Sequence, residues 1–282
     1  NFCFEAGLPP VLEVIPEEDQ RAVFERAVGP VIAEYATNIE PIAKQLGQEE
    51  WQAILKEIID KARTNNLAGE DLRVHAERSW QGLKHVLPKP FPESKEDELD
   101  EAVYSAISDA LIKIDANDTT QATRKFKTNI QRIQQRTSSA KDLAWPEWVR
   151  LIKNGPGAKT RAAWEPIAQA ASVHPNHPRF HRDLEAFILL IFECAAKAMQ
   201  RFADVKKREG WIDFVDQEAL LLDLLSSKTF SDLLSERMSR LFVDEFQDTS
   251  PIQLALFVKM AAVVDGTIWV GDQKQSIYGF RG

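Results

Sequence analysis

The sequence predicts a mainly α-helical protein with a small α/β part at its C-terminal end. Apolar residues recur at three-to-four spacing through most of the first 210 residues, which is the period of an amphipathic helix. After Gly210, two short apolar runs flank a further helical pattern. With 282 residues, 44% of them hydrophobic, the chain can bury one large core or two smaller ones.

Four helices are well marked in the helical part. Each combines the helical period with a boundary signal, such as acidic residues in the first turn or a glycine after the last. In the third helix, Phe126, Ile130 and Ile133 are expected on the buried side, and the apolar run 187–194 is expected to be a buried spine of the fourth. The four ranges are 16–36, 93–114, 122–136 and 179–210.

The part after Gly210 is expected to form one helix and then a strand–helix–strand unit. Short apolar runs are typical of buried parallel strands. Ser250 suits a helix N-cap and Pro251 suits the first helical position. The expected order is a helix at 211–227, a strand at 239–245, a helix at 250–264 and a strand at 266–272.

The composition excludes several classes of protein. No apolar run approaches 18 residues, so we expect no membrane span and no membrane partner. The first ten residues have neither a basic start nor a long apolar stretch, so they do not resemble a signal peptide. Two cysteines, Cys3 and Cys194, are too few for a disulfide framework, which favours a reducing, cytoplasmic location.

Charge is unevenly distributed along the chain. The net charge is −8, yet residues 121–164 hold ten Lys or Arg against two Asp or Glu. Such a segment could contact a phosphate backbone, or it could be a solvated helix face. Trp145, Trp148 and Trp164 fall within it and could stack on bases, although tryptophans that pack between helices are commoner.

Polar residues follow each predicted strand of the α/β part. Asp244 and Glu245 end the first strand, and 271–275 follow the second. Ligands of parallel α/β sheets bind at the carboxyl ends of the strands. An aspartate there can hold Mg²⁺ and an adjacent glutamate can orient and deprotonate a water molecule. The two loops together therefore predict a magnesium–nucleotide site.

The same residues resemble a known family. The stretches VDEFQDTSPIQ and VGDQKQSIYGFRG are similar to motifs II and III of the UvrD/Rep-type superfamily-1 DNA helicases, and 206–225 is similar to the segment that precedes motif II. Lys274 and Phe280 look more like the RecB/AddA exonuclease-associated branch. The resemblance implies a helical inserted subdomain over 1–210, joined to a partial RecA-like P-loop NTPase core over 211–282.

The resemblance also implies roles for individual residues. Asp244 would hold magnesium, Glu245 would be the catalytic base, and Gln275 would contact the γ-phosphate of ATP. The cofactors would be ATP and Mg²⁺, and the partners would be single-stranded or duplex DNA and a possible second helicase–nuclease subunit. The residues that would lie along single-stranded DNA are Tyr278, Phe280 and Arg281.

The phosphate-binding loop GxxxxGK[ST] that such a site needs is not found in the sequence. The nearest imitation is NGPGAKT at 154–160, where Ala158 stands in place of the glycine before Lys159, and a turn between two helices explains it. The simplest interpretation is that the chain is a fragment of a longer 3′-to-5′ helicase with motifs II and III only. We therefore expect the chain alone not to hydrolyse ATP.

Two alternatives from other classes remain open. One is a non-catalytic DNA-binding or partner-docking module that binds through 121–164 and does not depend on Asp244 or Glu245. The other is a different nucleoside triphosphatase, in which Lys159 would contact the phosphates.

Two further groups of residues resemble functional sites less closely. The spacing of His174, His177 and His181 could suit a metal, but the intervening prolines favour a connection between helices. Cys194 lies in an apolar helical stretch and is expected in the core rather than as a nucleophile.

Overall fold

The computed structural model describes residues 12–114, 120–137, 139–153 and 158–272, and most of them are helical. The chain divides into two compact units, which are described separately. The first unit contains the residues up to 35, residues 52–75 and those from 192 onward, whereas the second contains 36–51 and 76–191. None of the described helices combines the length and the apolar character needed to cross a membrane.

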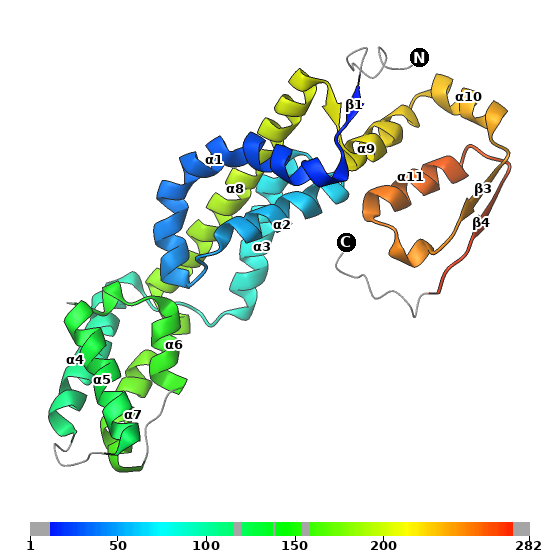
Figure 1. Cartoon of the computed structure of the whole chain (residues 1–282). Helices are drawn as coiled ribbons and strands as arrows, with labels where there is room; N and C mark the ends of the chain where they lie inside the picture. The colour runs from blue at the N-terminus through cyan, green and yellow to red at the C-terminus, as the bar shows by residue number, and fades with distance from the viewer. Residues whose placement is uncertain (1–11, 115–119, 138, 154–157, 273–282) are drawn as a thin grey trace. The chain divides into compact units, whose positions relative to one another are not determined.

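The elements follow one another along the chain as Figure 1 shows. The α-helices are α1 (Glu17–Leu46), α2 (Trp51–Thr64), α3 (Gly69–Val86), α4 (Glu96–Lys113), α5 (Gln121–Arg136), α6 (Trp145–Lys153), α7 (Arg161–Ala171), α8 (Pro178–Glu209), α9 (Phe214–Leu224), α10 (Lys228–Arg237) and α11 (Pro251–Ala261). The strands are β1 (Glu13–Val14), β2 (Trp211–Ile212), β3 (Arg240–Val243) and β4 (Gly266–Trp269). Short 3₁₀ helices are η1 (Glu93–Lys95), η2 (Ala140–Asp142), η3 (Ala158–Thr160), η4 (His174–Asn176) and η5 (Phe246–Asp248).

The four helices that the sequence marks most clearly are confirmed as parts of α1, α4, α5 and α8. α1 begins with three acidic residues, which interact favourably with the positive end of the helix dipole, and it ends before Gly47 in a left-handed conformation. α8 ends in the same way at Gly210. The predicted buried side of α5, made of Phe126, Ile130 and Ile133, is confirmed.

The core of the second unit is built mainly by α4 to α7. Trp145 and Trp148 are almost fully buried in it, and Trp164 packs against it. The indole Nε1 of Trp145 donates to Asp183 Oδ2 at 2.8 Å, and that of Trp164 donates to the Leu151 carbonyl oxygen at 2.8 Å. These tryptophans therefore pack between helices, which agrees with the structural interpretation rather than with base stacking.

The strand–helix–strand unit predicted after Gly210 is confirmed in the first unit. β3 and β4 pair in parallel, with Val243 opposite Trp269, and α11 connects them. α11 packs on α9 through a small apolar core of Leu222, Leu225, Ile252 and Leu256. Figure 1 shows α11 alongside the two strands.

The prediction of one helix over 211–227 is wrong at its start and at its end. Trp211 and Ile212 form β2, which pairs in parallel with β1, and the helix begins only after Asp213. The helix ends at Leu224, because a separate helix, α10, follows a short turn. The partner strand β1 lies about 200 residues earlier in the chain, so no local pattern announces the pairing.

Candidate functional site

The polar residues predicted at the two strand ends lie beside each other. Asp244 and Glu245 follow β3 directly, and Gly271 and Asp272 follow β4 at the same edge of the sheet. The backbone N–H of Val270 donates to the Val243 carbonyl oxygen at 2.8 Å, so the strand pairing continues up to the loops. Both motif carboxylates are exposed to solvent and are open to a ligand.

Glu245 has a left-handed backbone conformation, with φ 50° and ψ 43°. A residue with a side chain is disfavoured there by about 1–2 kcal/mol. Such strain is typical of functional loops whose surroundings fix the geometry. Here the Glu245 N–H donates to Asp244 Oδ1 at 3.0 Å, and the Gln247 side-chain amide donates to the Glu245 carboxylate.

Gln247 joins the two loops of the site. Its Nε2 donates to Glu245, and its Oε1 accepts the backbone N–H of Asp272 at 3.1 Å. The Phe246 N–H also donates to the Val270 carbonyl oxygen at 3.2 Å. The loop after β3 is therefore held to the loop after β4 by one side chain and one backbone bond, a role for Gln247 that the sequence reasoning did not anticipate.

Gly271 is required by close approach rather than by an unusual dihedral angle. A Cβ atom at this position would meet Gln247 Oε1 at 2.3 Å and Phe246 Cδ1 at 2.5 Å. Real Cβ atoms do not approach other heavy atoms so closely, so any other residue would displace the loop that carries Glu245. The glycine in the resemblance to motif III thus has a direct packing reason.

Helix α11 fixes the far end of the motif II loop. Ser250 accepts the Gln253 N–H, and Gln253 in turn accepts the Ser250 N–H at 3.0 Å, which is a capping box. Gln253 Nε2 also donates to Glu218 Oε1 of α9 at 2.6 Å. The predicted N-cap at Ser250 and first-turn Pro251 are confirmed, and they tie the site to α9.

Helix α9 is itself anchored by a buried cluster of four charges. Asp213 caps the helix, and both of its carboxylate oxygens accept from Arg63 Nη2 at 2.6 Å. Lys206 donates to Asp213 Oδ2 at 3.0 Å, and Asp216 completes the cluster. Burial alone would raise the pKa of Asp213, but the charges of Arg63 and Lys206 outweigh it, so that pKa lies below its ordinary value.

Four predicted site residues lie outside the described part of the chain. These are Gln275, Tyr278, Phe280 and Arg281, and their roles stay predictions. The segment Asn154–Gly157 of the imitation phosphate loop is also outside it. The described residues on its two sides belong to the helix α6 and to η3, rather than to a strand that leads into a phosphate loop.

Other candidate residues have structural surroundings. His174 and His181 each pair with a backbone carbonyl oxygen, whereas His177 lies 3.4 Å from Asp100. In the described ranges, no three His, Cys, Asp or Glu side chains converge as a metal site would require. Cys194 is fully buried, which together with nearby Glu193 raises its pKa to about 12, so its prediction as a core residue is confirmed.

Comparison with known proteins gives the family. The model of the UvrD/REP helicase N-terminal domain matches residues 17–282. This chain belongs to that family. The UvrD/REP match covers the helical part as well as the two motifs, and so it extends the resemblance read from 206–282.

Curated relatives of this UvrD/REP chain are named as AddA-type subunits of ATP-dependent helicase/nucleases, and the predicted resemblance to the AddA branch is confirmed. The Syntrophomonas wolfei protein is 37% identical over 100 residues, which is 33% of this chain and 8% of that protein. The Lactobacillus helveticus protein is 30% identical over 106 residues, 36% of this chain and 9% of that protein. The chain therefore matches less than a tenth of the length of these relatives.

Proposed function

We propose that this chain is part of the motor of an ATP-dependent DNA helicase, or helicase–nuclease, that moves 3′-to-5′ on single-stranded DNA. The observation that carries the proposal is the meeting of Asp244–Glu245 with Gly271–Asp272 at the carboxyl ends of two paired parallel strands. The UvrD/REP membership and the names of the relatives support the same function. The direction rests on the family resemblance alone.

The residues at this edge fit a magnesium–nucleotide complex. Mg²⁺ prefers carboxylate oxygens and water as ligands, and Asp244 offers an exposed carboxylate beside the strand end. When bound, Mg²⁺–ATP would supply the phosphoryl group and neutralise developing charge. Asp244 would hold the ion, and the Glu245 carboxylate would accept the proton of the attacking water.

Gln247 would position Glu245 for that step. A single carboxylate on a loop can adopt several rotamers, whereas the hydrogen bond from Gln247 fixes one of them. Because the same side chain holds the Asp272 N–H, a movement of the motif III loop would be transmitted to the base. In this proposal Gln275 contacts the γ-phosphate, and Tyr278, Phe280 and Arg281 carry the movement to DNA.

The first experiment measures ATP turnover by this chain, with and without single-stranded oligonucleotide, beside a Glu245→Gln control. Since the sequence contains no GxxxxGK[ST] loop, we expect no turnover above the control. Turnover that disappears in Glu245→Gln would mean that these residues contain a working phosphate loop, and Lys159→Ala would then test the imitation at 154–160.

The second experiment uses the full-length protein. There Glu245→Gln should lower kcat by about 100-fold or more, as expected when a catalytic base is lost. Glu98→Gln is the matched control, because Glu98 is an exposed carboxylate of α4 without an ion pair in the described residues. Equal activity of the two variants would contradict the proposal.

A second candidate is a non-catalytic DNA-binding or docking module. It is favoured by the exposed side of α5, where Arg124, Lys125 and Arg132 make no ion pair with a described residue. This candidate predicts that replacing all three by glutamine weakens DNA binding and flattens its salt dependence, while Asp244→Asn has no effect. A loss of function in Asp244→Asn would exclude it.

A further inference from the structure

Two cavities of the first unit share a wall that is made by Trp211 and Arg26. The first has a volume of about 440 Å³ and the second about 310 Å³, and both residues line both cavities. The Arg26 guanidinium lies 5.5 Å from the centroid of the Trp211 ring, a cation–π arrangement. The lining residues include none from the two helicase motifs, so the proposed ATP chemistry leaves these cavities unexplained.

The backbone fixes the position of the Trp211 ring. Trp211 opens β2, which follows the left-handed Gly210 and pairs with β1. The Glu13 N–H donates to the Gly210 carbonyl oxygen at 2.9 Å, and the Ile15 N–H donates to the Ile212 carbonyl oxygen at 2.8 Å. The indole is therefore held in place before any ligand binds, which reduces the entropy that binding must remove.

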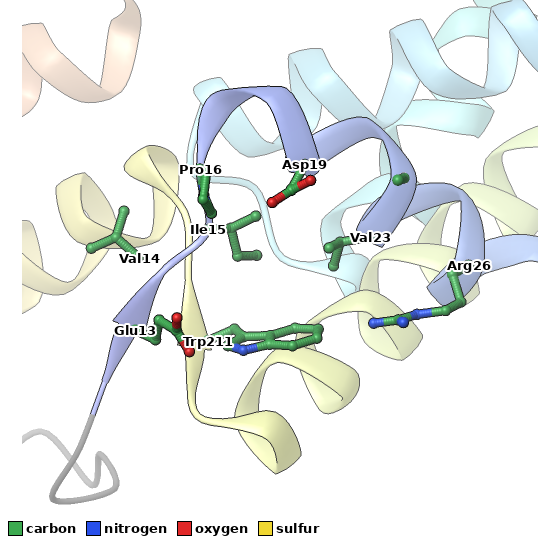
Figure 2. A pocket seen from close by; sticks show the side chains of 9 residues that line it. Glu13, Val14, Ile15, Pro16, Asp19, Val23, Arg26 and Trp211 are labelled. Atoms are coloured by element: carbon green, nitrogen blue, oxygen red, sulfur yellow. The ribbon is translucent and has the colours of Figure 1, made fainter.

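The first cavity has apolar walls and one acceptor. Figure 2 shows Ile15, Asp19 and Val23 on the same side of the Trp211 ring, which is seen nearly edge-on. Ile15 is buried, whereas the Asp19 carboxylate is exposed and can accept hydrogen bonds. A flat group with apolar faces and N–H donors on its edge matches these surroundings, and nucleobases have both features.

The second cavity is cationic. Arg26, Arg201 and Arg208 line it against the single carboxylate of Glu209. Arg201 and Arg208 lie seven residues apart on one face of α8. Arg208 pairs with Glu209, but Arg26 and Arg201 have no ion-pair partner within the described ranges of the chain. Guanidinium groups bind phosphate oxygens well because their donors match that geometry.

We propose that Trp211, Arg26 and their two cavities bind one nucleotide unit, with the base against Trp211 and the phosphate at Arg26, Arg201 and Arg208. Its chemistry is a nucleobase joined to a phosphate, whether in a free nucleotide or in single-stranded nucleic acid. An acidic peptide would also satisfy the arginines, but the carboxylates of Glu13 and Asp19 at the first cavity would repel it.

The test measures equilibrium binding by calorimetry on the whole chain, with EDTA present and no ATP. The probes are dGMP, a short single-stranded oligodeoxynucleotide and a poly-glutamate peptide. Trp211→Ala and Arg201→Gln should each weaken nucleotide binding by about tenfold, while Trp211→Phe should restore most of it because a ring remains. Arg21→Gln is the matched control, since Arg21 is an exposed arginine of α1 that lines neither cavity.

The outcomes separate the two sources of the nucleotide. Loss of affinity for dGMP supports the site with a free nucleotide as occupant, and loss for the oligonucleotide alone supports it with single-stranded nucleic acid. The proposal is overturned if neither nucleotide probe binds or if the variants match Arg21→Gln. Binding of poly-glutamate through Arg201, without a nucleotide effect, would also overturn it. Because magnesium and ATP are absent, failure of the proposed helicase chemistry would not change any of these results.

Discussion

The helical second unit and the α/β part of the first unit are stabilised in different ways. In the second unit the largest side chains are hidden, and Trp148 is 0% exposed. In the α/β part, by contrast, Phe242 is 67% exposed, and Ile268 and Val270 are also exposed. Its small apolar core is supplemented by directed polar contacts, such as Gln253 to Glu218.

One region therefore depends mainly on apolar burial, and the other depends more on hydrogen bonds and ion pairs. Burial of apolar surface is non-directional and insensitive to pH. Buried ion pairs require both partners in their charged forms and fail when one is removed. The two regions should consequently respond to different substitutions and to different solution conditions.

Trp148→Ala should have the largest effect. The change removes a fully buried ring from the core of the second unit, and large-to-small changes of this kind cost about 3–5 kcal/mol. Urea unfolding measures the loss of unfolding free energy. Val86→Ala, at a side chain that is 75% exposed, is the control and should change it by less than about 0.5 kcal/mol.

Asp213→Asn should have the next largest effect, in the α/β part. It leaves Arg63 and Lys206 without their main carboxylate, and breaking a buried pair costs about 3 kcal/mol or more. The control is Asp232→Asn, because Asp232 pairs with Lys228 on the exposed surface, where a pair contributes less than about 1 kcal/mol. Amide exchange should place the loss in α9 and α11, and protection equal to that of the control would contradict the prediction.

The same cluster gives a pH dependence with a definite sign. Because the pKa of Asp213 in the folded chain lies below its ordinary value of 3.8, its stabilising contribution is complete above that value. The contribution is lost as the pH falls through the lowered pKa. Unfolding measured from neutral pH down to acid should therefore decline less steeply in Asp213→Asn, and identical slopes would exclude this role for Asp213.

Gly271→Ala should destabilise the chain by about 2 kcal/mol, the cost of overpacking, because the added Cβ overlaps Gln247 and Phe246. Gly29→Ala is a control with the opposite sign. Gly29 lies inside α1 with no atom near its added Cβ, so alanine there should stabilise by about 0.5–1 kcal/mol. Thermal unfolding of both variants measures the difference, and two changes of the same sign would contradict the packing argument.

Phe242→Ser should have the smallest effect on stability. The side chain is mostly exposed, so the free energy of unfolding should change by less than about 0.5 kcal/mol. Self-association, measured by sedimentation, should decrease, because the exposed apolar face of β3 and β4 becomes more polar. Ile252→Ser, in the buried core between α9 and α11, should instead destabilise strongly. A large loss in Phe242→Ser would mean that this face is covered.

Much of the secondary structure, and the place of the candidate site, could be predicted from the order of the residues alone. The helical period marked the buried side of α5, and Ser250 with Pro251 marked the start of α11. The carboxylates Asp244 and Glu245 could be placed at a strand end, because a strand, its turn and the next helix are encoded within a few consecutive residues.

The contacts that join distant segments became visible only in the folded chain. Arg63 meets Asp213 across 150 residues, and Trp211 is drawn into a strand by β1 rather than into the predicted helix. Gly271 became necessary only when the loop that contains Gln247 lay against it. Such contacts leave no periodic signal along the chain, since they depend on which surfaces meet after the helices and strands have formed.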